Sequence, residues 1–225
     1  MRSPESIRRG ALANANTATL VEALVPTRAC AETYSDATEP RMFPAEAAAV
    51  ANAVASRRRE FATARCCARR ALARIGMPPI PIVPDPDGAP RWPTGVVGSI
   101  THCAGYRAAA VARSSDLLGL GIDAEPHAAV PAEALDLIAR DEERERLLAL
   151  ADERPNLHWD RILFSAKEAV FKAWFPLTGS WLDFEDVSIT LRLDGTFGAC
   201  LRDADLSGRW KVDRGLIVAA TSLSP

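Results

Sequence analysis

The order of apolar and polar residues along the chain predicts several amphipathic helices separated by short strands. Helical spacing of apolar residues is found over 44–73, in a segment that begins at Pro131, over 141–152 and over 161–175. Gly76, followed closely by two prolines, is expected to end the first helix. Asp160 is a suitable N-cap for the last helix, which we expect to stop before Pro176.

Strands are expected where short apolar runs or strict alternation replace the helical spacing. They cover residues 20–25, 96–100, 108–112, 117–122, 187–193 and 216–220. The proline-rich segment 77–93 is predicted to be an irregular loop, and Asp194-Gly195 a hairpin turn. This order of elements is typical of an α+β fold, with two similar α/β lobes. We expect the N-terminal lobe over residues 1–114 and the C-terminal lobe over residues 115–225.

The composition is that of a globular protein with a core, because 48% of the 225 residues are hydrophobic and 25% are charged. No apolar run approaches the roughly 20 residues that span a bilayer. Residues 1–19 are polar, carry no predicted element and lack the apolar centre of a secretion signal. Five cysteines without a CxxC pair indicate reduced thiols. We therefore expect a cytoplasmic protein that makes no membrane contact.

Charge is unevenly divided between the two halves of the chain. Residues 1–114 contain 15 arginines, no lysine and 9 acidic residues, whereas residues 115–225 contain 12 basic and 20 acidic residues. The halves therefore carry net charges of +6 and -8. This division suits a site in which one lobe binds phosphates and the other holds a cation, although differently solvated faces would give the same counts. The basic half has few aromatic residues, which disfavours a nucleic-acid partner.

Two acidic residues follow the predicted strand that contains Gly119 and Gly121. Asp123 and Glu125 are spaced i, i+2, so an extended backbone projects both carboxylates to the same side, where they can share a hard cation. The two glycines leave room for another backbone or a ligand to approach closely. Taken alone, this pair is more often an acidic exit from a strand than a metal site.

The predicted helix 161–175 carries a second candidate group. Glu168 lies on a face with several phenylalanines, where a carboxylate needs a partner such as a metal ion. Lys167 and Lys172 lie within one turn and can reach a phosphate. A surface ion pair between Glu168 and Lys172 explains the same pattern equally well.

Two upstream segments offer groups that bind phosphate. Ser99 and His102 follow a glycine and can both form hydrogen bonds to phosphate oxygens. Arg57 and Arg65 are spaced to share one side of the first helix, where guanidinium groups can clamp phosphate bidentately. The alternatives are a structural histidine and a solvated basic helix face. With three histidines in the chain, we expect no histidine metal site.

Together these segments resemble the 4'-phosphopantetheinyl transferases, in particular the actinobacterial enzymes that activate fatty-acid, polyketide and peptide synthases. The similarity runs from about residue 43 to residue 181. Each motif is weak alone, but their order and spacing are highly specific. The motifs are Arg57-Arg58-Arg59-Glu60-Phe61 with Arg65, Trp92-Pro93, Gly98-Ser99-Ile100-Thr101-His102-Cys103-Ala104-Gly105-Tyr106, Gly121-Ile122-Asp123-Ala124-Glu125, and Phe164-Ser165-Ala166-Lys167-Glu168-Ala169 with Lys172.

The resemblance implies two lobes related by a pseudo-twofold axis, with the active site between them, and a monomer. It implies coenzyme A as donor, Mg²⁺ as metal, and a serine of an apo acyl or peptidyl carrier protein as acceptor. The metal ligands would be Asp123, Glu125 and Glu168. The residues that contact the coenzyme A phosphates and nucleotide would be Ser99, His102, Lys167, Lys172, Arg57 and Arg65.

The implied reaction is attack of the carrier serine on the β-phosphate, with release of 3',5'-ADP. Glu168 is the candidate general base, while His102 and Lys167 are expected to position the phosphates. One departure from the family is the acidic loop with Asp85 and Asp87, where relatives often have a basic residue. Either Arg91 substitutes for that residue or the 3'-phosphate is held less tightly. The alternatives are another Mg²⁺-dependent nucleotide phosphohydrolase and a non-catalytic coenzyme A-binding protein.

Overall fold

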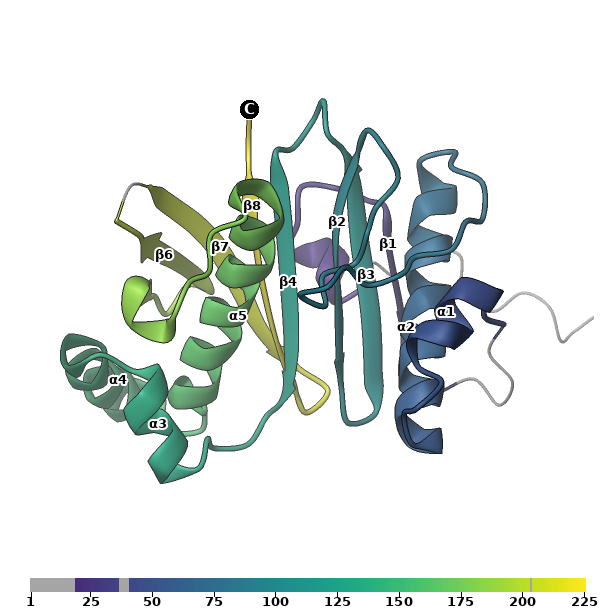
Figure 1. Ribbon diagram of the computed structural model, residues 1–225. Coiled ribbons are helices and arrows are strands. Elements are labelled where there is room, and N and C mark those ends of the chain that lie inside the picture. Colours follow the sequence, from purple (N-terminus) through teal and green to yellow (C-terminus); the bar gives the residue numbers. More distant parts are fainter. Residues whose placement is uncertain (1–18, 37–40, 203) are drawn as a thin grey trace, which may run out of the picture.

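Two antiparallel sheets lie side by side in the structure, a computed structural model that describes residues 19–36, 41–202 and 204–225 (Figure 1). The first sheet has the order β1-β3-β2 and the second has the order β4-β8-β7-β6-β5. The strands are β1 (Cys30–Thr33), β2 (Val96–Cys103), β3 (Tyr106–Arg113), β4 (Gly119–Pro126), β5 (Ser188–Leu191), β6 (Thr196–Cys200), β7 (Asp205–Asp213) and β8 (Leu216–Leu223). The expectation for residues 1–18 lies outside the described part of the chain.

Helices flank both sheets, which confirms the predicted α+β class (Figure 1). The α-helices are α1 (Pro44–Ala49), α2 (Ala55–Arg74), α3 (Ala132–Ile138), α4 (Asp141–Glu153) and α5 (Trp159–Thr178). Two short 3₁₀ helices are η2 (Val21–Ala23) and η3 (Phe184–Asp186). Within the described residues, no helix has both the length and the apolar character needed to span a membrane. The predicted lobe boundary falls between β3 and β4, and the division into two lobes stays a prediction.

Helix α2 packs on the first sheet through small residues. Ala68, Ala71 and Leu72 are buried against Ala109 and Val111 of β3. Small side chains let the helix axis approach the sheet closely, which suits the alanine-rich sequence. The helix ends at Arg74 with Ile75 as its C-cap, and Gly76 follows in the left-handed region with φ of 77°, as expected for a helix end.

Helix α5 approaches β4 so closely that only glycine fits at two strand positions. A Cβ atom on Gly121 would lie 1.9 Å from the carbonyl oxygen of Ala169, and one on Gly119 would lie 2.7 Å from that of Ala173. The expectation that these glycines permit close approach is confirmed, and the approaching group is the backbone of α5. This contact fixes the α5 side chains against the acidic end of β4.

The two sheets meet along β2 and β4, where side-chain hydroxyls replace part of a backbone ladder. The N–H of Ile122 donates to Ser99 Oγ over 3.1 Å, and the N–H of Ala124 donates to Thr101 Oγ1 over 2.9 Å. Both partners advance by two residues in the same direction, so β2 and β4 run parallel here. A buried cluster that includes Tyr106, Ile122 and Val218 continues across this junction.

Several predicted boundaries were wrong. The helix predicted over 44–73 is divided into α1 and α2 by residues 50–54, and residues 20–25 contain η2 instead of a strand. Helix α5 continues through Pro176 and ends before Gly179, whose φ is 67°. Pro176 is tolerated because it lies in the last turn, where only one backbone hydrogen bond of the helix is lost.

Strand β4 is longer than predicted. Since it runs to Pro126, Asp123 and Glu125 lie within the paired strand and do not form a loop exit. Asp160, the predicted N-cap of α5, is inside the helix, and its Oδ2 accepts a hydrogen bond from the N–H of Val130. It therefore fastens the segment before α3 to the start of α5.

Candidate active site

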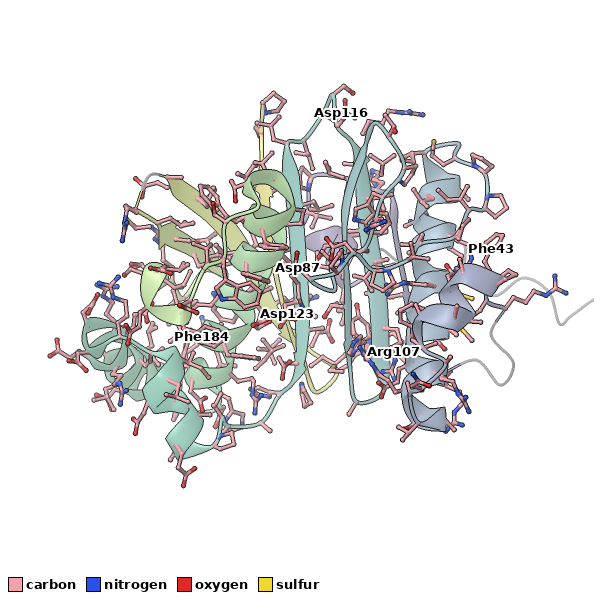
Figure 2. The ribbon with its side chains drawn as sticks, viewed as in Figure 1. Phe43, Asp87, Arg107, Asp116, Asp123 and Phe184 are labelled. Atoms are coloured by element: carbon pink, nitrogen blue, oxygen red, sulfur yellow. The ribbon has the colours of Figure 1, made fainter. Side chains whose placement is uncertain are left out.

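Asp123 lies at the centre of the molecule, on β4 between α5 and β2 (Figure 2). Its side chain is 5% exposed. Oδ1 accepts hydrogen bonds from Lys172 Nζ over 2.6 Å and from Thr101 Oγ1 over 3.3 Å. Oδ2 is buried and has no hydrogen-bond partner among the described residues. A buried carboxylate oxygen without a partner is costly, so this atom is suited to a cation.

Glu168 and Lys172 face Asp123 from successive turns of α5. Lys172 Nζ is 3.9 Å from Glu168 Oε2, so the alternative ion pair is present, but Asp123 is the nearer partner. Burial raises the pKa of Glu168, with Lys172 opposing and Asp123 adding to the shift. Burial alone would lower the pKa of Lys172, but the attraction of Asp123 and Glu168 outweighs it and raises that pKa. The two carboxylates thus share one lysine cation.

Glu125 is held by a different cation. Its Oε2 is 2.9 Å from Arg161 Nη1, and the same guanidinium donates to the carbonyls of Ala128 and Ala129. Burial and then Asp123 raise the pKa of Glu125, while Arg161 opposes the shift. Arg161 therefore ties Glu125 to the chain that follows β4.

The three acids expected to hold a metal are not gathered into one ligand group. Across residues 19–36, 41–202 and 204–225, no three His, Cys, Asp or Glu side chains are arranged to hold a metal ion. Asp123 and Glu168 nonetheless fit Mg²⁺, because their oxygens are hard ligands and Asp123 Oδ2 has no other partner. The metal roles of Asp123, Glu125 and Glu168 stay predictions.

Lys167 points away from this group of carboxylates, in contrast to Lys172. Its ammonium donates to the carbonyls of Ile138 and Phe184 over 2.8 and 2.7 Å and pairs with Glu143 at 2.7 Å. Burial lowers the pKa of Lys167, and Glu143 opposes the shift. All three donors of the ammonium are used inside the protein. This geometry does not support the expected contact with a phosphate.

Arg57 and His102 meet between α2 and β2. Arg57 Nη1 lies 2.7 Å from His102 Nε2, so the neutral imidazole accepts a hydrogen bond from the guanidinium. Desolvation and then the charge of Arg57 lower the pKa of His102, which favours the neutral ring. This pair places a basic group beside β2, and the phosphate-binding roles of Arg57 and His102 stay predictions.

Arg65 and Ser99 have structural partners. Arg65 is 7% exposed, donates from Nε to the carbonyl of Ile82 over 2.9 Å, and lies 4.0 Å above the centre of the Phe61 ring. Burial lowers its pKa to about 10. Ser99 Oγ accepts from Ile122 N–H. Arg57 and Arg65 have different hydrogen-bond partners, His102 and the carbonyl of Ile82, although the charge of Arg57 contributes to the lowered pKa of Arg65.

Cavities open on both sides of Lys172 and Glu168. One of about 340 Å³ is lined by Lys167, Glu168, Phe171, Trp181, Leu182, Asp183, Phe184 and Val187. A second of about 220 Å³ is lined by Gly98, Ser99, Phe171, Lys172 and Phe175 together with residues of the 77–93 loop. Arg91 lines a neighbouring cavity of about 380 Å³ with Trp92 and Lys172. The expected substitute Arg91 is therefore near Lys172, at a site that an anionic ligand can enter.

Sequence reasoning did not assign functions to Thr101 and Arg161. Thr101 bonds both Asp123 and the backbone of β4, and its i, i+2 spacing from Ser99 on one strand was the available signal. Arg161 had no such signal, because its partner Glu125 is 36 residues away in the sequence.

The comparisons agree on one family. Residues 45–112 match the family model described as 4'-phosphopantetheinyl transferase N-terminal domain, and residues 119–221 match that of the 4'-phosphopantetheinyl transferase superfamily. The chain therefore belongs to the 4'-phosphopantetheinyl transferase superfamily and is an enzyme of this class.

Curated relatives from actinobacteria are similar over most of their length. The 4'-phosphopantetheinyl transferase Svp of Streptomyces mobaraensis is 49% identical over 220 residues, which cover 91% of this chain and 89% of the relative. PptT of Mycobacterium tuberculosis is 46% identical over 228 residues, covering 91% and 98%. Npt of Nocardia iowensis is 45% identical over 201 residues, covering 80% and 88%. The predicted resemblance to the actinobacterial type is confirmed.

Proposed function

We propose that this enzyme transfers the 4'-phosphopantetheine group of coenzyme A to a serine of apo acyl or peptidyl carrier proteins, in a Mg²⁺-dependent reaction. The observation that carries the proposal is Asp123 Oδ2, a buried oxygen without a described partner, beside Glu168 and Lys172, each of which lines a cavity. An anionic cosubstrate and a cation would complete this site. The family membership supplies the identity of the transferred group.

In the proposed reaction, the carrier serine Oγ forms a bond to the β-phosphorus of coenzyme A, and the bond to the bridging oxygen of the pyrophosphate breaks. 3',5'-ADP leaves with that oxygen. Glu168 takes the serine proton, directly or through a water, and its raised pKa suits a base that works near neutral pH. When bound, Mg²⁺ supplies positive charge that offsets the charge on the phosphate oxygens.

The chain's own cations are proposed to position the phosphates. Lys172 lies between the carboxylates and the cavities, while Arg57, His102 and Arg91 line the approach from the N-terminal side. Such positioning is most of what phosphoryl transfer needs from a protein. Lys167 is left out of this set, because its ammonium is enclosed by Glu143 and two carbonyls.

The exposed arginines at the start of α2 are proposed to help dock the carrier. Arg57, Arg58 and Arg59 are all exposed. Carrier proteins of this class are acidic around their serine, and opposite charges steer association. The Michaelis constant for the carrier should therefore rise with added salt; a salt-independent constant would contradict this docking mode.

Intact-mass measurement of an apo carrier protein tests the function. The carrier, incubated with enzyme, coenzyme A and Mg²⁺, should gain the mass of one phosphopantetheine group, and a chelator should prevent the gain. Asp123→Asn should abolish it, whereas Asp213→Asn, which removes a carboxylate paired to Lys211 on β7, should not. Failure across several carriers, with release of phosphate from nucleotides instead, would favour the phosphohydrolase alternative.

A further inference from the structure

Two lysines on α5 differ in their freedom to move, although they are separated by little more than one turn. The side chain of Lys167 is 1% exposed and bound to a carboxylate and two carbonyls. The side chain of Lys172 is 29% exposed, and carboxylates of Asp123 and Glu168 are its partners. Because Lys172 and Glu168 are each 29% exposed, another cation can reach the carboxylates that Lys172 binds, whereas the enclosed Lys167 offers no such access.

We propose that Lys172 is a built-in counter-cation that competes with the divalent metal for Asp123 and Glu168, so that metal binding releases its ammonium to bind phosphate. The inference rests on the proposed function, because it needs that metal at these carboxylates. Metal binding and cosubstrate binding are thereby coupled. Mg²⁺ lowers the affinity of the carboxylates for Lys172, and the freed lysine raises the affinity of the enzyme for the anionic cosubstrate.

The surroundings of Lys172 give a released ammonium a place to go. The side chain lines the cavity of about 220 Å³ and the cavity of about 380 Å³, between α5, β2 and the 77–93 loop. Asp85 and Arg91 line the larger of these cavities and Asp87 lines the smaller, beside uncharged residues such as Gly98. A lysine has a flexible four-carbon stem, so the ammonium can turn from the carboxylates to a phosphate without movement of the helix.

The charges around Asp123 explain why such a cation is needed before metal binds. Lys172 Nζ lies 2.6 Å from Asp123 Oδ1 and 3.9 Å from Glu168 Oε2, so one ammonium serves both carboxylates. Two carboxylates this close, without a cation, would repel each other in a partly buried site. Glu125 has its own cation in Arg161, so Lys172 serves the remaining two. A ligand that must displace a bound cation shows a weaker apparent affinity.

Metal titration without coenzyme A tests the competition. By isothermal titration calorimetry, Lys172→Met should bind Mg²⁺ about tenfold more tightly than the wild type, because the competitor is gone. Lys172→Arg, which keeps the charge, should bind Mg²⁺ as weakly as the wild type. Lys211→Met removes a lysine paired to Asp213 at 2.9 Å on β7 and should not alter Mg²⁺ binding. Unchanged affinity in Lys172→Met would overturn the competition.

Lys172→Met leaves Asp123 without its cation, so a second variant controls for loss of folding. Lys172→Gln keeps a donor for Asp123 without the charge and should also bind Mg²⁺ more tightly. In both variants, Mg²⁺ should raise the midpoint of thermal unfolding more than in the wild type, because a ligand that binds the folded state stabilises it. An equal rise in wild type and variants would contradict the proposal.

Chemical labelling reads the released ammonium directly. Acetylation by acetic anhydride, followed by peptide mass spectrometry, should increase at Lys172 when Mg²⁺ is added and stay constant at Lys211. No increase at Lys172 would overturn the release step. The carrier mass assay tests the proposed function separately. If the carrier is modified but the Mg²⁺ affinity is equal in all variants, the proposed function stands and this inference is wrong.

Discussion

A buried glutamate fastens a short helix to a long one in both the N-terminal part of the chain, before residue 115, and the C-terminal part, after it. In α1, Glu46 accepts hydrogen bonds from the N–H groups of Phe43 and Ile82. In α4, Glu143 accepts them from Arg140 and Ile189. Both glutamates occupy the third helical position, where they cap their own helix and bind a distant backbone N–H.

The long helices supply the cations, and here the two parts differ. Arg69 of α2 lies 2.6 Å from Glu46 and its side chain is 13% exposed. Lys167 of α5 lies 2.7 Å from Glu143 and its side chain is 1% exposed. The C-terminal pair is therefore the more completely enclosed of the two.

This difference explains how the motif Lys167-Glu168 serves two purposes. Successive helix residues project about 100° apart, so one faces the interior while the next faces the cleft. The pairing of Lys167 with Glu143 fixes the rotation of α5, and Glu168 is thereby directed beside Asp123 and Lys172. In the N-terminal part the equivalent fastening binds Ile82, and so positions the loop that lines the second cavity.

The largest expected effect is a difference in stability between variants of these two glutamates. Glu143→Ala should lower the free energy of unfolding by about 3–5 kcal/mol, because it leaves a buried lysine without its carboxylate. Glu46→Ala should cost about 1–3 kcal/mol, since the guanidinium of Arg69 can reach water while two N–H groups lose an acceptor. Urea unfolding followed by circular dichroism measures both.

An equal or larger loss in Glu46→Ala would show that the enclosure of the cation does not decide the stability of these pairs. Glu142→Ala is the control, because Glu142 is 44% exposed and pairs with Arg140 at the surface. It should change the free energy of unfolding by less than about 1 kcal/mol.

A second contrast concerns glycines in the two central strands. An alanine at Gly121 would place Cβ 1.9 Å from the Ala169 carbonyl, whereas one at Gly98 would lie 2.8 Å from the Ala110 carbonyl and 2.9 Å from the Trp92 ring. Gly121→Ala should cost about 2–3 kcal/mol and Gly98→Ala about 1 kcal/mol, because both Cβ atoms would meet a backbone carbonyl but the overlap at Gly121 is deeper. Chemical denaturation compares them.

Gly121→Ala should also affect catalysis. Displacement of α5 by Gly121→Ala should move Glu168 and Lys172 away from Asp123, so activity should fall even under conditions where the variant is folded. Full activity in folded Gly121→Ala would mean that the close approach of α5 to β4 does not position the site.

A third pair tests the hydroxyls that join β2 to β4. Thr101→Val should lower the free energy of unfolding by about 2 kcal/mol and Ser99→Ala by about 1 kcal/mol. Both leave a β4 N–H without its acceptor, but Thr101 also donates to Asp123. Thermal and urea unfolding would measure the difference, and an equal cost would mean that the bond to Asp123 adds nothing.

The sequence predicted the long elements and the members of the site better than their partners. Helices α2 and α5 and the close approach at Gly121 followed from residue spacing and size, which are local properties. Strand β7 was missed because Gly208 interrupts its inward-facing apolar residues, and β1 because it has four residues.

The hydrogen-bond and ion-pair partners of these side chains could not be predicted from the sequence, because they depend on which element packs against each side chain. Lys167 and Lys172 are both one turn or less from Glu168, yet α4 and η3 enclose the first and β4 faces the second. Arg65 has the same helical spacing as a phosphate clamp, but the carbonyl of Ile82 and the ring of Phe61 take its guanidinium.

The smallest expected effect compares a histidine from each part of the chain. The pKa of His102 is lowered by desolvation and by Arg57, and that of His127 by desolvation and by His158. In both cases the unfolded chain, with a histidine pKa near 6.5, binds a proton more readily than the folded protein. The stability that these neutral rings contribute is fully present above about pH 6.5, the pKa in the unfolded chain. It is lost as the pH falls from about 6.5 through the lower pKa of the folded protein.

The test measures the free energy of unfolding at pH 8 and at pH 5.5. It compares the wild type with His102→Asn and His127→Asn. Each variant should lose less stability than the wild type on acidification, because the ring that resists protonation is absent. The difference should be larger for His102, since it faces a full positive charge 2.7 Å away, whereas His127 faces the ring of His158. If His127→Asn changed the pH dependence more, burial together with the charge of Arg57 would not make His102 the more resistant of the two rings to protonation.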